Sequence, residues 1–421
     1  MRSVYTLLFY LLTPLILFRL FWRGFKAPEY RKRWLERLAI YNTNFTRDVI
    51  WIHAVSVGEA EAVFPLVKRL QQQFPTDKFL ITTTTPTGSA RVQAVLADTV
   101  AHVYLPYDLP NVINRFLATF KPKVAIVMEK EIWPNLYAGL AKNNIPLMII
   151  NARLSANSAK GYKKIPALVK PALAAVTWIA TQTAEDRQRF IEIGSKADRT
   201  RVTGNLKFDL LLEGDIIQQA QKIKKNLFAD RFVWLIASTH DKEEEIFFEL
   251  YPQLKKRIPE LLIMVAPRHP ERFELVNQLA NKMQLKTSQR SLQQQCTEAT
   301  DVYIADTMGE LKLLYGAVDV CFVGGSMVPV GGHNILEPAA MGTPIMFGPY
   351  MVNFKEIAKN VLDLNAAIQC EDKQALIEAI THLYSDADYR IDIAAKAKQF
   401  VNKNQGATEA TAKLIAQHIS A

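Results

Sequence analysis

The stretch DVIWIHAVSVGEAEAVFPLVKRLQQQ, residues 48–73, decides the fold class. Its first part, DVIWIHAV, is an apolar run of strand length, and its second part, AEAVFPLVKRLQQQ, has the amphipathic spacing of a helix. The turn between the two parts is only a few residues long. A strand that passes so directly into a helix is the repeating unit of a parallel α/β sheet.

The same alternation continues along the chain in two series of apolar, strand-length runs separated by helical segments. Runs that are apolar on both faces predict parallel sheets covered by helices on both sides. We therefore expect two doubly wound, Rossmann-like α/β domains that face each other across a cleft, over residues 26–208 and 209–421, the second with a helical tail. The runs are VIWIHAV, FLITTTT, VAHVYLP, VAIVME, PLMIINA, VTWIATQ and RVTGN in the first series, and VWLIAST, LLIMVAP, VYIADT, VDVCFVGG and PIMFGP in the second.

The charge of the chain is concentrated near its N-terminus. The 421 residues carry a formal net charge of +10, and residues 1–40 hold eight basic and two acidic residues, which is more than half of the surplus. A nucleic-acid-binding protein spreads its charge along a face of the fold, so we expect no nucleic-acid partner. The scattered Cys296, Cys321 and Cys370 match no metal-binding spacing and are expected to be reduced thiols.

The longest uncharged apolar run, VYTLLFYLLTPLILF at residues 4–18, lies in the same N-terminal segment. It is shorter than the about 20 residues of a membrane-spanning helix, although RLFWRGF after it extends the pattern. No small-residue cleavage site follows, so we expect an uncleaved membrane anchor or an interfacial helix over residues 1–25, not a signal peptide. Basic residues crowd its carboxyl side, which predicts a body on the cytoplasmic face of the membrane.

A carboxylate, Glu59, stands in the turn from the first strand to its helix. Acidic residues are favoured there by up to about 1 kcal/mol, because the free N–H groups of a helix start carry partial positive charge. The alternative is a general base, because α/β folds keep their chemistry at the carboxyl ends of parallel strands. The residue pattern leaves both interpretations open. His53, just before the turn, is expected to be structural.

The glycine-rich stretch FVGGSMVPVGGHNILEPAAMGTPIMFGP, residues 322–349, predicts an anion site in the second half of the chain. Glycines let a ligand approach the backbone, and the start of the helix expected at residues 331–334 offers free N–H groups to a phosphate. We assign Gly332 and Asn334 to this site, and Glu337 to ribose hydroxyls. The spacing is neither GxGxxG nor GxxxxGK[ST], which argues against dinucleotide binding and ATP hydrolysis.

Other polar residues also follow predicted strands. Cations at such an edge suit a phosphate or carboxylate, and a solvated loop charge explains them equally well. Paired carboxylates suit acid–base chemistry, but acids that start a helix are the commoner explanation. The DAD sequence at residues 386–388 follows a helix, so we expect a helix–helix turn with an N-cap and no metal. The strand-end residues are Lys207, Arg268, Met308, Gly309 and Glu310, and, in the first half of the chain, Glu129, Glu131 and Arg153.

Seven motifs taken in order resemble one family. HAVSVGE, TTTTPTG, EKEIWPN, NARLS, GNLKFD, APRHPERF and GGHNILEP are similar to the bacterial 3-deoxy-D-manno-octulosonic acid (Kdo) transferases of lipopolysaccharide assembly, which have the GT-B fold. The likeness covers nearly the whole chain, including the N-terminal segment. Lys130 departs from the family pattern, in which a small polar residue is expected between the two glutamates.

The resemblance implies CMP-Kdo as donor and lipid IVA as acceptor, at the cytoplasmic face of the inner membrane, without a metal or other cofactor. It implies that Glu59 removes the proton of the acceptor 6′ hydroxyl, which attacks with inversion. Two alternatives remain: another GT-B enzyme, such as a UDP-sugar transferase or epimerase, and a non-catalytic membrane protein that binds a nucleotide sugar. The implied donor-binding residues are Lys207, Arg268, Met308, Gly309, Glu310, Gly332, Asn334 and Glu337, and the implied acceptor-binding residues are Ser56, Glu129, Glu131 and Arg153.

Overall fold

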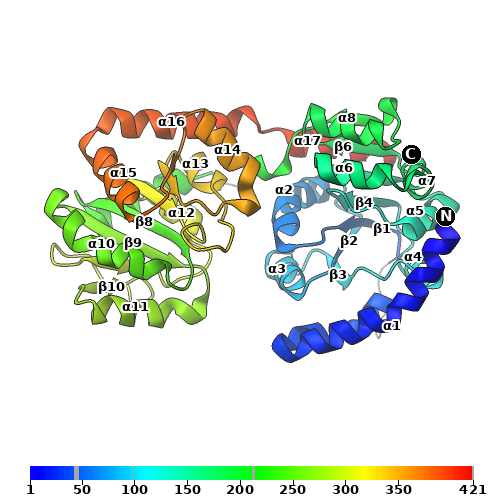
Figure 1. Ribbon diagram of the computed structural model, residues 1–421, viewed down its shortest axis with the longest axis horizontal. Helices are drawn as coiled ribbons and strands as arrows, with labels where there is room; N and C mark the ends of the chain where they lie inside the picture. Colours follow the sequence, from blue (N-terminus) through cyan, green and yellow to red (C-terminus); the bar gives the residue numbers. More distant parts are fainter. Residues whose placement is uncertain (42–46, 97, 211–213, 420–421) are drawn as a thin grey trace. The chain divides into compact units, whose positions relative to one another are not determined.

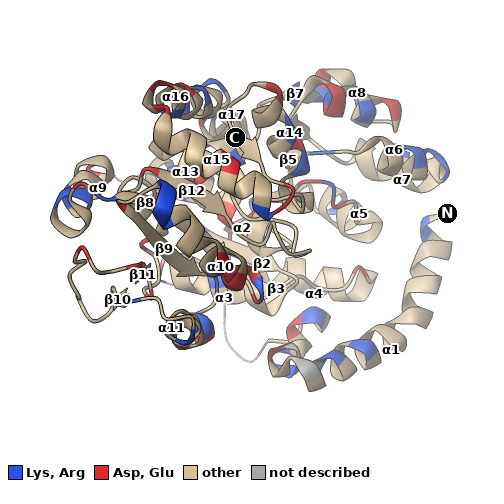
Figure 2. Ribbon diagram, turned by 60° about the vertical axis from the view of Figure 1, so that its left-hand side comes forward, with Lys and Arg blue, Asp and Glu red and all other residues tan. Residues whose placement is uncertain are grey.

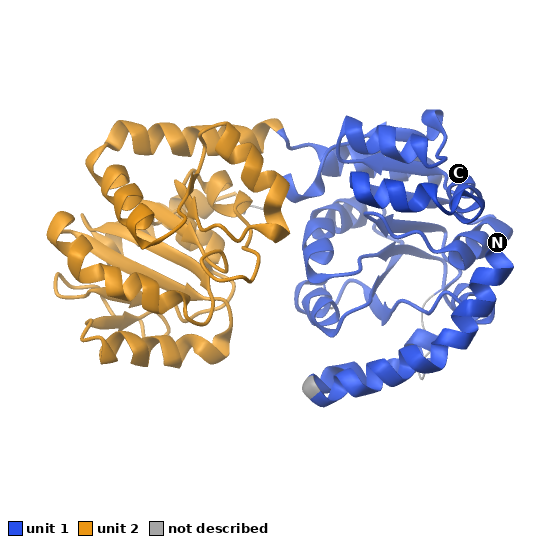
Figure 3. Ribbon diagram, in the orientation of Figure 1, with its two compact units in different colours: residues 1–209, 404–421 blue, residues 210–403 orange. Residues whose placement is uncertain are grey.

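The computed structural model describes residues 1–41, 47–96, 98–210 and 214–419. The chain forms two compact units (Figure 3): unit 1 contains residues 1–209 and 404–421, and unit 2 contains residues 210–403. The sequence prediction places the whole helical tail in the second domain, and here the structure differs. The last helix, α17 (Ala407–Ile419), belongs to unit 1, because its Ala412, Leu414 and Ile415 enter a buried apolar cluster of that unit.

Unit 1 is built on seven parallel strands. They are β1 (Val49–His53), β2 (Lys78–Thr83), β3 (Ala101–Tyr104), β4 (Val124–Met128), β5 (Leu147–Ala152), β6 (Trp178–Thr181) and β7 (Thr200–Val202). Their order in the sheet is β3-β2-β1-β4-β5-β6-β7 (Figure 1). The carboxyl ends of β1, β4 and β5 are therefore neighbours, which brings three of the predicted motifs to one edge of the sheet.

Helices connect these strands. They are α2 (Val57–Gln73), α3 (Pro86–Leu96), α4 (Pro110–Phe120), α5 (Pro134–Lys142), α6 (Ala156–Lys163), α7 (Pro166–Ala174) and α8 (Ala184–Glu192), with short 3₁₀ turns η3 (Ala197–Arg199) and η4 (Leu206–Phe208) near the end of the unit. Alternate residues of β1 enter two different cores: Trp51 packs against Phe116, and Ile50 and Ile52 join a cluster with α2. Both faces of the sheet are thus buried, as the apolar runs predict.

Unit 2 repeats this architecture. Its strands are β8 (Phe232–Thr239), β9 (Leu261–Pro267), β10 (Thr287–Gln289), β11 (Val302–Ile304), β12 (Val320–Val323), β13 (Ile345–Phe347) and β14 (Ile368–Gln369). Their order is β10-β11-β9-β8-β12-β13-β14, and all the pairs are parallel. The two edge strands, β10 and β14, are absent from the predicted runs because they are short and partly polar.

The helical segments of unit 2 complete the doubly wound arrangement. They are α9 (Ile216–Ile223), a π-helical turn η5 (Lys224–Phe228), α10 (Glu243–Arg257), η6 (Pro270–Arg272), α11 (Phe273–Lys282), α12 (Leu311–Tyr315), α13 (Leu336–Met341), η7 (Val352–Phe354), α14 (Lys355–Asp363), α15 (Lys373–Ser385) and α16 (Ala387–Lys403). The carboxylate of Asp386, in the predicted helix–helix turn, accepts the backbone N–H of Tyr389 at 2.9 Å. That residue therefore caps α16, as predicted.

The N-terminal helix α1 (Arg2–Lys26) lies along the outside of unit 1 (Figures 1 and 2). Its 25 residues include Pro14, and the predicted run 4–18 lies within it, toward its N-terminal end. By length and composition α1 is apolar enough to cross a membrane. The chain then turns back through η1 (Pro28–Arg31) and η2 (Trp34–Leu38).

Some of the basic residues after α1 contact unit 1 and are therefore not available to bind a membrane surface. Arg37 is only 6% exposed, donates to the Thr84 carbonyl at 2.8 Å and lies over the Tyr104 ring. Arg33 forms an ion pair with Glu36 and donates to the carbonyl of His102 at 2.8 Å. The surplus charge that the sequence assigns to a membrane-facing segment is therefore partly built into the fold of unit 1.

Candidate active site

The turn between β1 and α2 holds Glu59 in a reciprocal cap. The Ser56 side chain accepts the backbone N–H of Glu59 at 3.4 Å, so Ser56 is the N-cap of α2. The Glu59 carboxylate in turn accepts the N–H of Val55 at 2.9 Å and the Ser56 hydroxyl at 3.3 Å. The structural interpretation of the carboxylate is therefore confirmed, since it satisfies backbone groups that a helix start leaves open.

The same carboxylate has the electrostatics of a base. Burial raises the pKa of Glu59 to about 7, and the negative charges of Glu129 and Glu131 add to this, against the lowering effect of the Val55 N–H. A base works best when its pKa lies near the operating pH, because it is then both ionised and able to hold a proton. Capping and proton transfer are compatible roles for this side chain.

Glu129 and Glu131 follow β4, the strand beside β1. The backbone of Glu129 has φ 58°, in the left-handed region, and its N–H bonds to the carbonyl of Ile150 at 2.9 Å. Burial raises the pKa of Glu131, and its neighbour Lys130 opposes this. The two glutamates thus surround Glu59 with negative charge, which makes them modulators of its pKa and poor partners for an anionic group.

Three further residues complete this edge of unit 1. Asn151, at the end of β5, has φ 49° and accepts the backbone N–H of Leu206 at 3.0 Å, so it fixes η4, which carries Lys207. Lys207 and Arg153 are both half-buried. The carboxyl edge of unit 1 therefore carries one candidate base with two cations in the adjoining strand-end loops. His53 is fully buried, and burial lowers its pKa to about 4, so it is a neutral structural residue, as expected.

In unit 2 a buried glutamate that the sequence did not single out organises the glycine-rich loop. The carboxylate of Glu243 accepts four backbone N–H groups, those of His240, Gly325, Ser326 and Met327, at 2.7–3.1 Å. Glu243 has no exposed surface. Three consecutive acids at residues 243–245 start α10, and sequence reasoning cannot tell a loop-binding member of such a run from ordinary first-turn acids.

A histidine pair lies beside this loop. His240 Nε2 and His333 Nε2 are 2.8 Å apart, the two rings are nearly parallel, and the ring of His269 lies 5.5 Å from that of His240. Burial and the neighbouring cationic groups, Arg268 among them, lower the pKa of both His240 and His333, the latter to about 4. The pair is therefore neutral, one ring donating to the other, and it fixes the glycine-rich loop to the end of β8.

The residues predicted to bind an anion at the glycine-rich loop are placed differently from the expectation. The helix after the loop, α13, begins at Leu336, and the Asn334 side chain accepts the N–H of Leu336 at 3.0 Å. Gly332 has φ 74°, and a Cβ there would lie 2.2 Å from the sulfur of Met351. Internal packing therefore explains Gly332, and Asn334 is engaged in the turn that starts α13. Glu337, in the first turn of α13, is half-buried.

Of the run 308–310, Glu310 already has protein partners. It forms a bidentate ion pair with Arg290 at 2.5 and 2.7 Å and accepts the hydroxyl of Thr307. Gly309 has φ 86° and open space beside it, and Met308 is 59% exposed. A cavity of about 360 Å³, lined by Arg290, Thr307 and Glu310 among others, adjoins this run. Arg268 follows β9 directly and is exposed, so it is a cation at the carboxyl edge of the unit 2 sheet that a ligand can reach.

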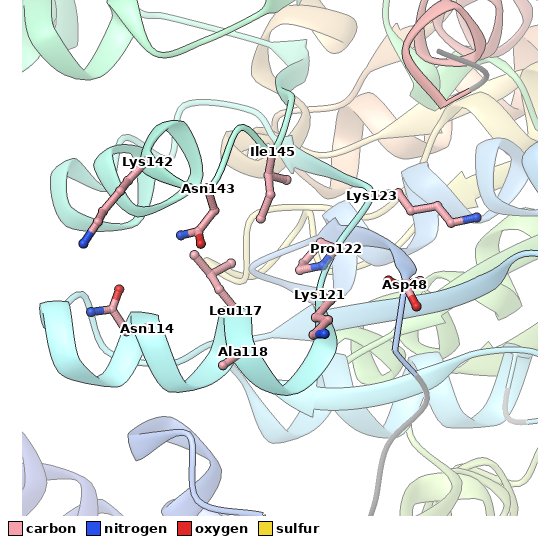
Figure 4. Close-up of a pocket in the computed structure, with 10 residues that line it drawn as sticks. All are labelled: Asp48, Asn114, Leu117, Ala118, Lys121, Pro122, Lys123, Lys142, Asn143 and Ile145. Carbon is pink, nitrogen blue, oxygen red and sulfur yellow. The ribbon is translucent and has the colours of Figure 1, made fainter.

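A cavity of about 590 Å³ lies apart from these sites (Figure 4). It is lined by Asp48, which precedes β1, by Lys121 and Lys123 before β4, and by residues of α4 and α5. This is the amino edge of the unit 1 sheet, opposite the edge where ligands of open α/β sheets bind. Among the described residues, no group of three or more His, Cys, Asp or Glu side chains is arranged to hold a metal ion.

Comparison of structures defines the class of the fold. UDP-GlcNAc 2-epimerase from Neisseria meningitidis, solved with bound UDP-GlcNAc, matches with a TM-score of 0.55 and 15% identity, over 89% of this chain and 99% of that one. At this level of identity the likeness shows the fold alone. The chain thus has a GT-B-like fold of two parallel α/β units.

Comparison of sequences identifies the family. The model of the 3-deoxy-D-manno-octulosonic-acid transferase (kdotransferase) family matches residues 32–210. The 3-deoxy-D-manno-octulosonic acid transferase of Haemophilus influenzae is 38% identical over 421 residues, which cover 99% of each chain. That of Bordetella pertussis is 33% identical over 375 residues, 86% of this chain and 85% of the relative. The chain belongs to the Kdo transferase family and is a glycosyltransferase.

Proposed function

We propose that this Kdo transferase uses CMP-Kdo as donor and lipid IVA as acceptor, with inversion, at the cytoplasmic face of the inner membrane during lipopolysaccharide core assembly. The observation that carries the proposal is the capped, half-buried Glu59, whose pKa is raised to about 7 at the carboxyl edge of unit 1. A transferase that activates a sugar hydroxyl needs such a base, whereas a protein that only binds a nucleotide sugar does not.

In the proposed reaction the 6′ oxygen of lipid IVA attacks the anomeric carbon of Kdo from the side opposite the phosphate. Its proton passes to the Glu59 carboxylate as the new C–O bond forms, and the bond from the anomeric carbon to the phosphate oxygen breaks. CMP keeps that electron pair and leaves as an anion, so the configuration inverts. The reactants are the acceptor hydroxyl, CMP-Kdo and the Glu59 carboxylate. The products are the Kdo glycoside, free CMP and protonated Glu59.

Cationic side chains are proposed to neutralise the donor, which carries a phosphate and a carboxylate. Arg268, exposed at the end of β9, and Lys207, at the edge of unit 1, are assigned to these groups, because charge-assisted hydrogen bonds to such anions are strong. Met308, Gly309 and Glu337 stay in the donor-binding proposal. For Gly332, Asn334 and Glu310 we propose that they shape the donor site, since each is already engaged within the protein.

The acceptor is proposed to bind at the edge of unit 1 that carries the base. Arg153 is the residue there that suits a lipid phosphate, whereas Glu129 and Glu131 would repel one, so we assign these two to tuning Glu59. The apolar α1 is proposed to hold the enzyme at the membrane in which the acceptor resides.

Mass spectrometry of lipid IVA after incubation with the enzyme tests the donor and the acceptor together. With CMP-Kdo we expect a mass increase of one or more Kdo residues, and with UDP-sugars none. Transfer from a UDP-sugar, or its epimerisation, with no product from CMP-Kdo would contradict the proposal. An analogue of lipid IVA that lacks only the 6′ hydroxyl should receive no Kdo, and this result would identify the 6′ hydroxyl as the attacking group.

A further inference from the structure

Helix α1 has two opposite faces. One is a stripe of apolar residues spaced three or four apart along the whole helix, each 53–68% exposed. They are Val4, Leu7, Leu8, Leu11, Leu15, Phe18, Phe21, Trp22 and Phe25. The opposite face contains the residues of intermediate exposure, Tyr5, Thr6, Phe9, Thr13, Ile16, Leu17 and Leu20. Such a division is typical of a helix that packs one side on a protein and leaves a continuous apolar stripe on the other.

The first third of α1 is bonded to the folded body of unit 1. The Tyr5 hydroxyl donates to Asp108 at 2.9 Å, and the Tyr10 hydroxyl donates to Asn111 at 2.7 Å. Asp108 is only 2% exposed and also accepts the backbone N–H groups at the start of α5. Phe9 packs against the apolar core that contains α4 and α5. The amino end of the helix is thus part of unit 1.

The chain that leaves the other end of α1 is bonded to the same body. In η2, Arg37 donates to the Thr84 carbonyl at 2.8 Å, and Glu36 accepts the N–H of Tyr104 at 3.0 Å. Arg31, just after the helix, lies over the rings of Phe21 and Phe25. The N-terminal part of α1 and the segment that follows α1 are therefore both held by contacts with unit 1.

This geometry does not allow α1 to cross a bilayer. A helix of 25 residues is roughly 37 Å long at 1.5 Å per residue, and a crossing puts its ends on opposite sides of a hydrocarbon layer of about 30 Å. The residues bonded to Tyr5 and Tyr10 would then have to lie beyond the membrane from those bonded to Arg37. A polar, folded unit cannot occupy both sides at once.

We propose that α1 lies in the plane of the membrane interface, with its apolar stripe immersed in one leaflet and its opposite face on unit 1. This rests on the membrane association in the proposed function and adds the orientation of the helix. The helix carries four basic residues and no acidic ones, which suits an anionic lipid surface (Figure 2). A second copy of the chain is disfavoured as the partner, because it would set two helices of the same positive charge against each other.

Spin labels on full-length protein bound to vesicles of phosphatidylethanolamine and phosphatidylglycerol test the orientation. Single cysteines replace Val4, Leu11, Phe18 or Phe25, two turns apart on the exposed stripe, in a background where Cys296 is changed to Ser. Phe9→Cys and Ile16→Cys on the opposite face are the matched controls. The accessibility of each label to oxygen and to a water-soluble nickel reagent gives its depth.

We expect the four stripe labels to lie at one shallow depth, about 5–10 Å below the phosphates, and the two control labels to be protected from both reagents. A profile with Val4 and Phe25 near opposite surfaces and the middle labels deepest would overturn the proposal in favour of a crossing helix. Spin–spin broadening between stripe labels would overturn it in favour of a second copy. Labels exposed to water at all four positions would also overturn it, yet would leave the transferase reaction, assayed with detergent-dispersed lipid IVA, untouched.

Discussion

The carboxylate of Glu59 combines a structural role with the one we propose in catalysis. It accepts the Val55 N–H and the Ser56 hydroxyl at the start of α2, while burial and two neighbouring glutamates raise its pKa to about 7. The cap fixes where the carboxylate points, and the raised pKa lets it take a proton near neutral pH. The sequence presents capping and proton transfer as alternatives, and in the structure they are compatible roles for one side chain.

The pH dependence of the reaction follows from this pKa. A base must be deprotonated, so kcat/KM should fall as the pH drops below about 7 and reach a plateau above it. Glu129→Gln removes a negative charge near Glu59, lowers the pKa of Glu59 and should move the acidic limb of the profile to lower pH. Rate profiles of wild type, Glu129→Gln and, as a control in unit 2, Glu298→Gln check this. If the acidic limb of the pH profile is the same in Glu129→Gln as in wild type, Glu129 does not influence the pKa of the base.

Arg268 is the exposed cation at the end of β9, and we assign it to an anionic group of the donor. Arg268→Ala should weaken CMP binding by about 1.5–3 kcal/mol, the contribution of a charge-assisted hydrogen bond. Isothermal titration with CMP measures this, with Arg257→Ala at the far end of α10 as the matched control. If the two variants bind CMP with equal affinity, Arg268 does not contact the donor and is a solvated loop charge.

At the scale of elements, a chain of hydrogen bonds joins the segment after α1 to the base. Arg37 in η2 donates to the Thr84 carbonyl, Thr84 donates twice to the Val55 carbonyl, and the Val55 N–H donates to Glu59. The loops after β1 and β2 are therefore fixed together by a side chain that precedes the sheet in sequence. A base displaced by about 1 Å loses up to roughly 10² in rate, so these contacts bear on catalysis.

Arg37→Gln should therefore lower kcat and alter the pH limb assigned to Glu59, with little change in CMP affinity. Arg115→Gln is the control, because Arg115 donates to the Leu38 carbonyl at 2.5 Å and holds the same segment without touching the loop of Thr84. Steady-state rates across pH for both variants distinguish the two effects. The same loss in both would mean that the segment matters only for stability.

The glycine-rich loop of unit 2 is held by hydrogen bonds to Glu243 at the start of α10. Glu243→Gln keeps the size of the side chain but replaces one carboxylate oxygen with an N–H donor that faces backbone N–H groups. The glycine-rich loop should loosen, and CMP should bind more weakly, by about tenfold or more if one charged hydrogen bond of at least 1.5 kcal/mol is lost. Glu244→Gln breaks the buried ion pair with Arg272 and leaves the loop contacts alone. A fall in CMP affinity that is equal in both variants would reflect general destabilisation.

At the scale of the whole molecule, the apolar runs predict the central strands well because those strands are buried on both faces. β10 and β14 escape prediction because two or three residues at a sheet edge carry too little apolar pattern. The place of α17 also escapes it, since an amphipathic helix does not reveal which of two units covers its apolar face. Local pattern thus predicts elements, and long-range packing decides where they go.

In the candidate site, too, local pattern reveals some residues and long-range contacts determine the others. Glu59 and Arg268 are visible in the sequence because they stand directly at strand ends. Glu243 and the pair of His240 and His333 are not, because their roles depend on contacts between residues more than eighty positions apart. Gly332 and Asn334 have internal contacts that the sequence does not reveal, since a ligand motif and a packing requirement leave the same residues in the sequence.

The central claim, that Glu59 is the base of Kdo transfer, is tested most directly by the turnover of Glu59→Gln. The variant is nearly isosteric, so its thermal unfolding and CMP affinity should match those of wild type. Ser56→Ala is the control for helix stability, because it removes the cap and the hydroxyl bonded to Glu59 but keeps the carboxylate. We predict that the rate of transfer from CMP-Kdo to lipid IVA at pH 8 falls by roughly 10²–10⁴ in Glu59→Gln and far less in Ser56→Ala. A rate for Glu59→Gln within about tenfold of wild type, below the usual contribution of a general base, would contradict the account.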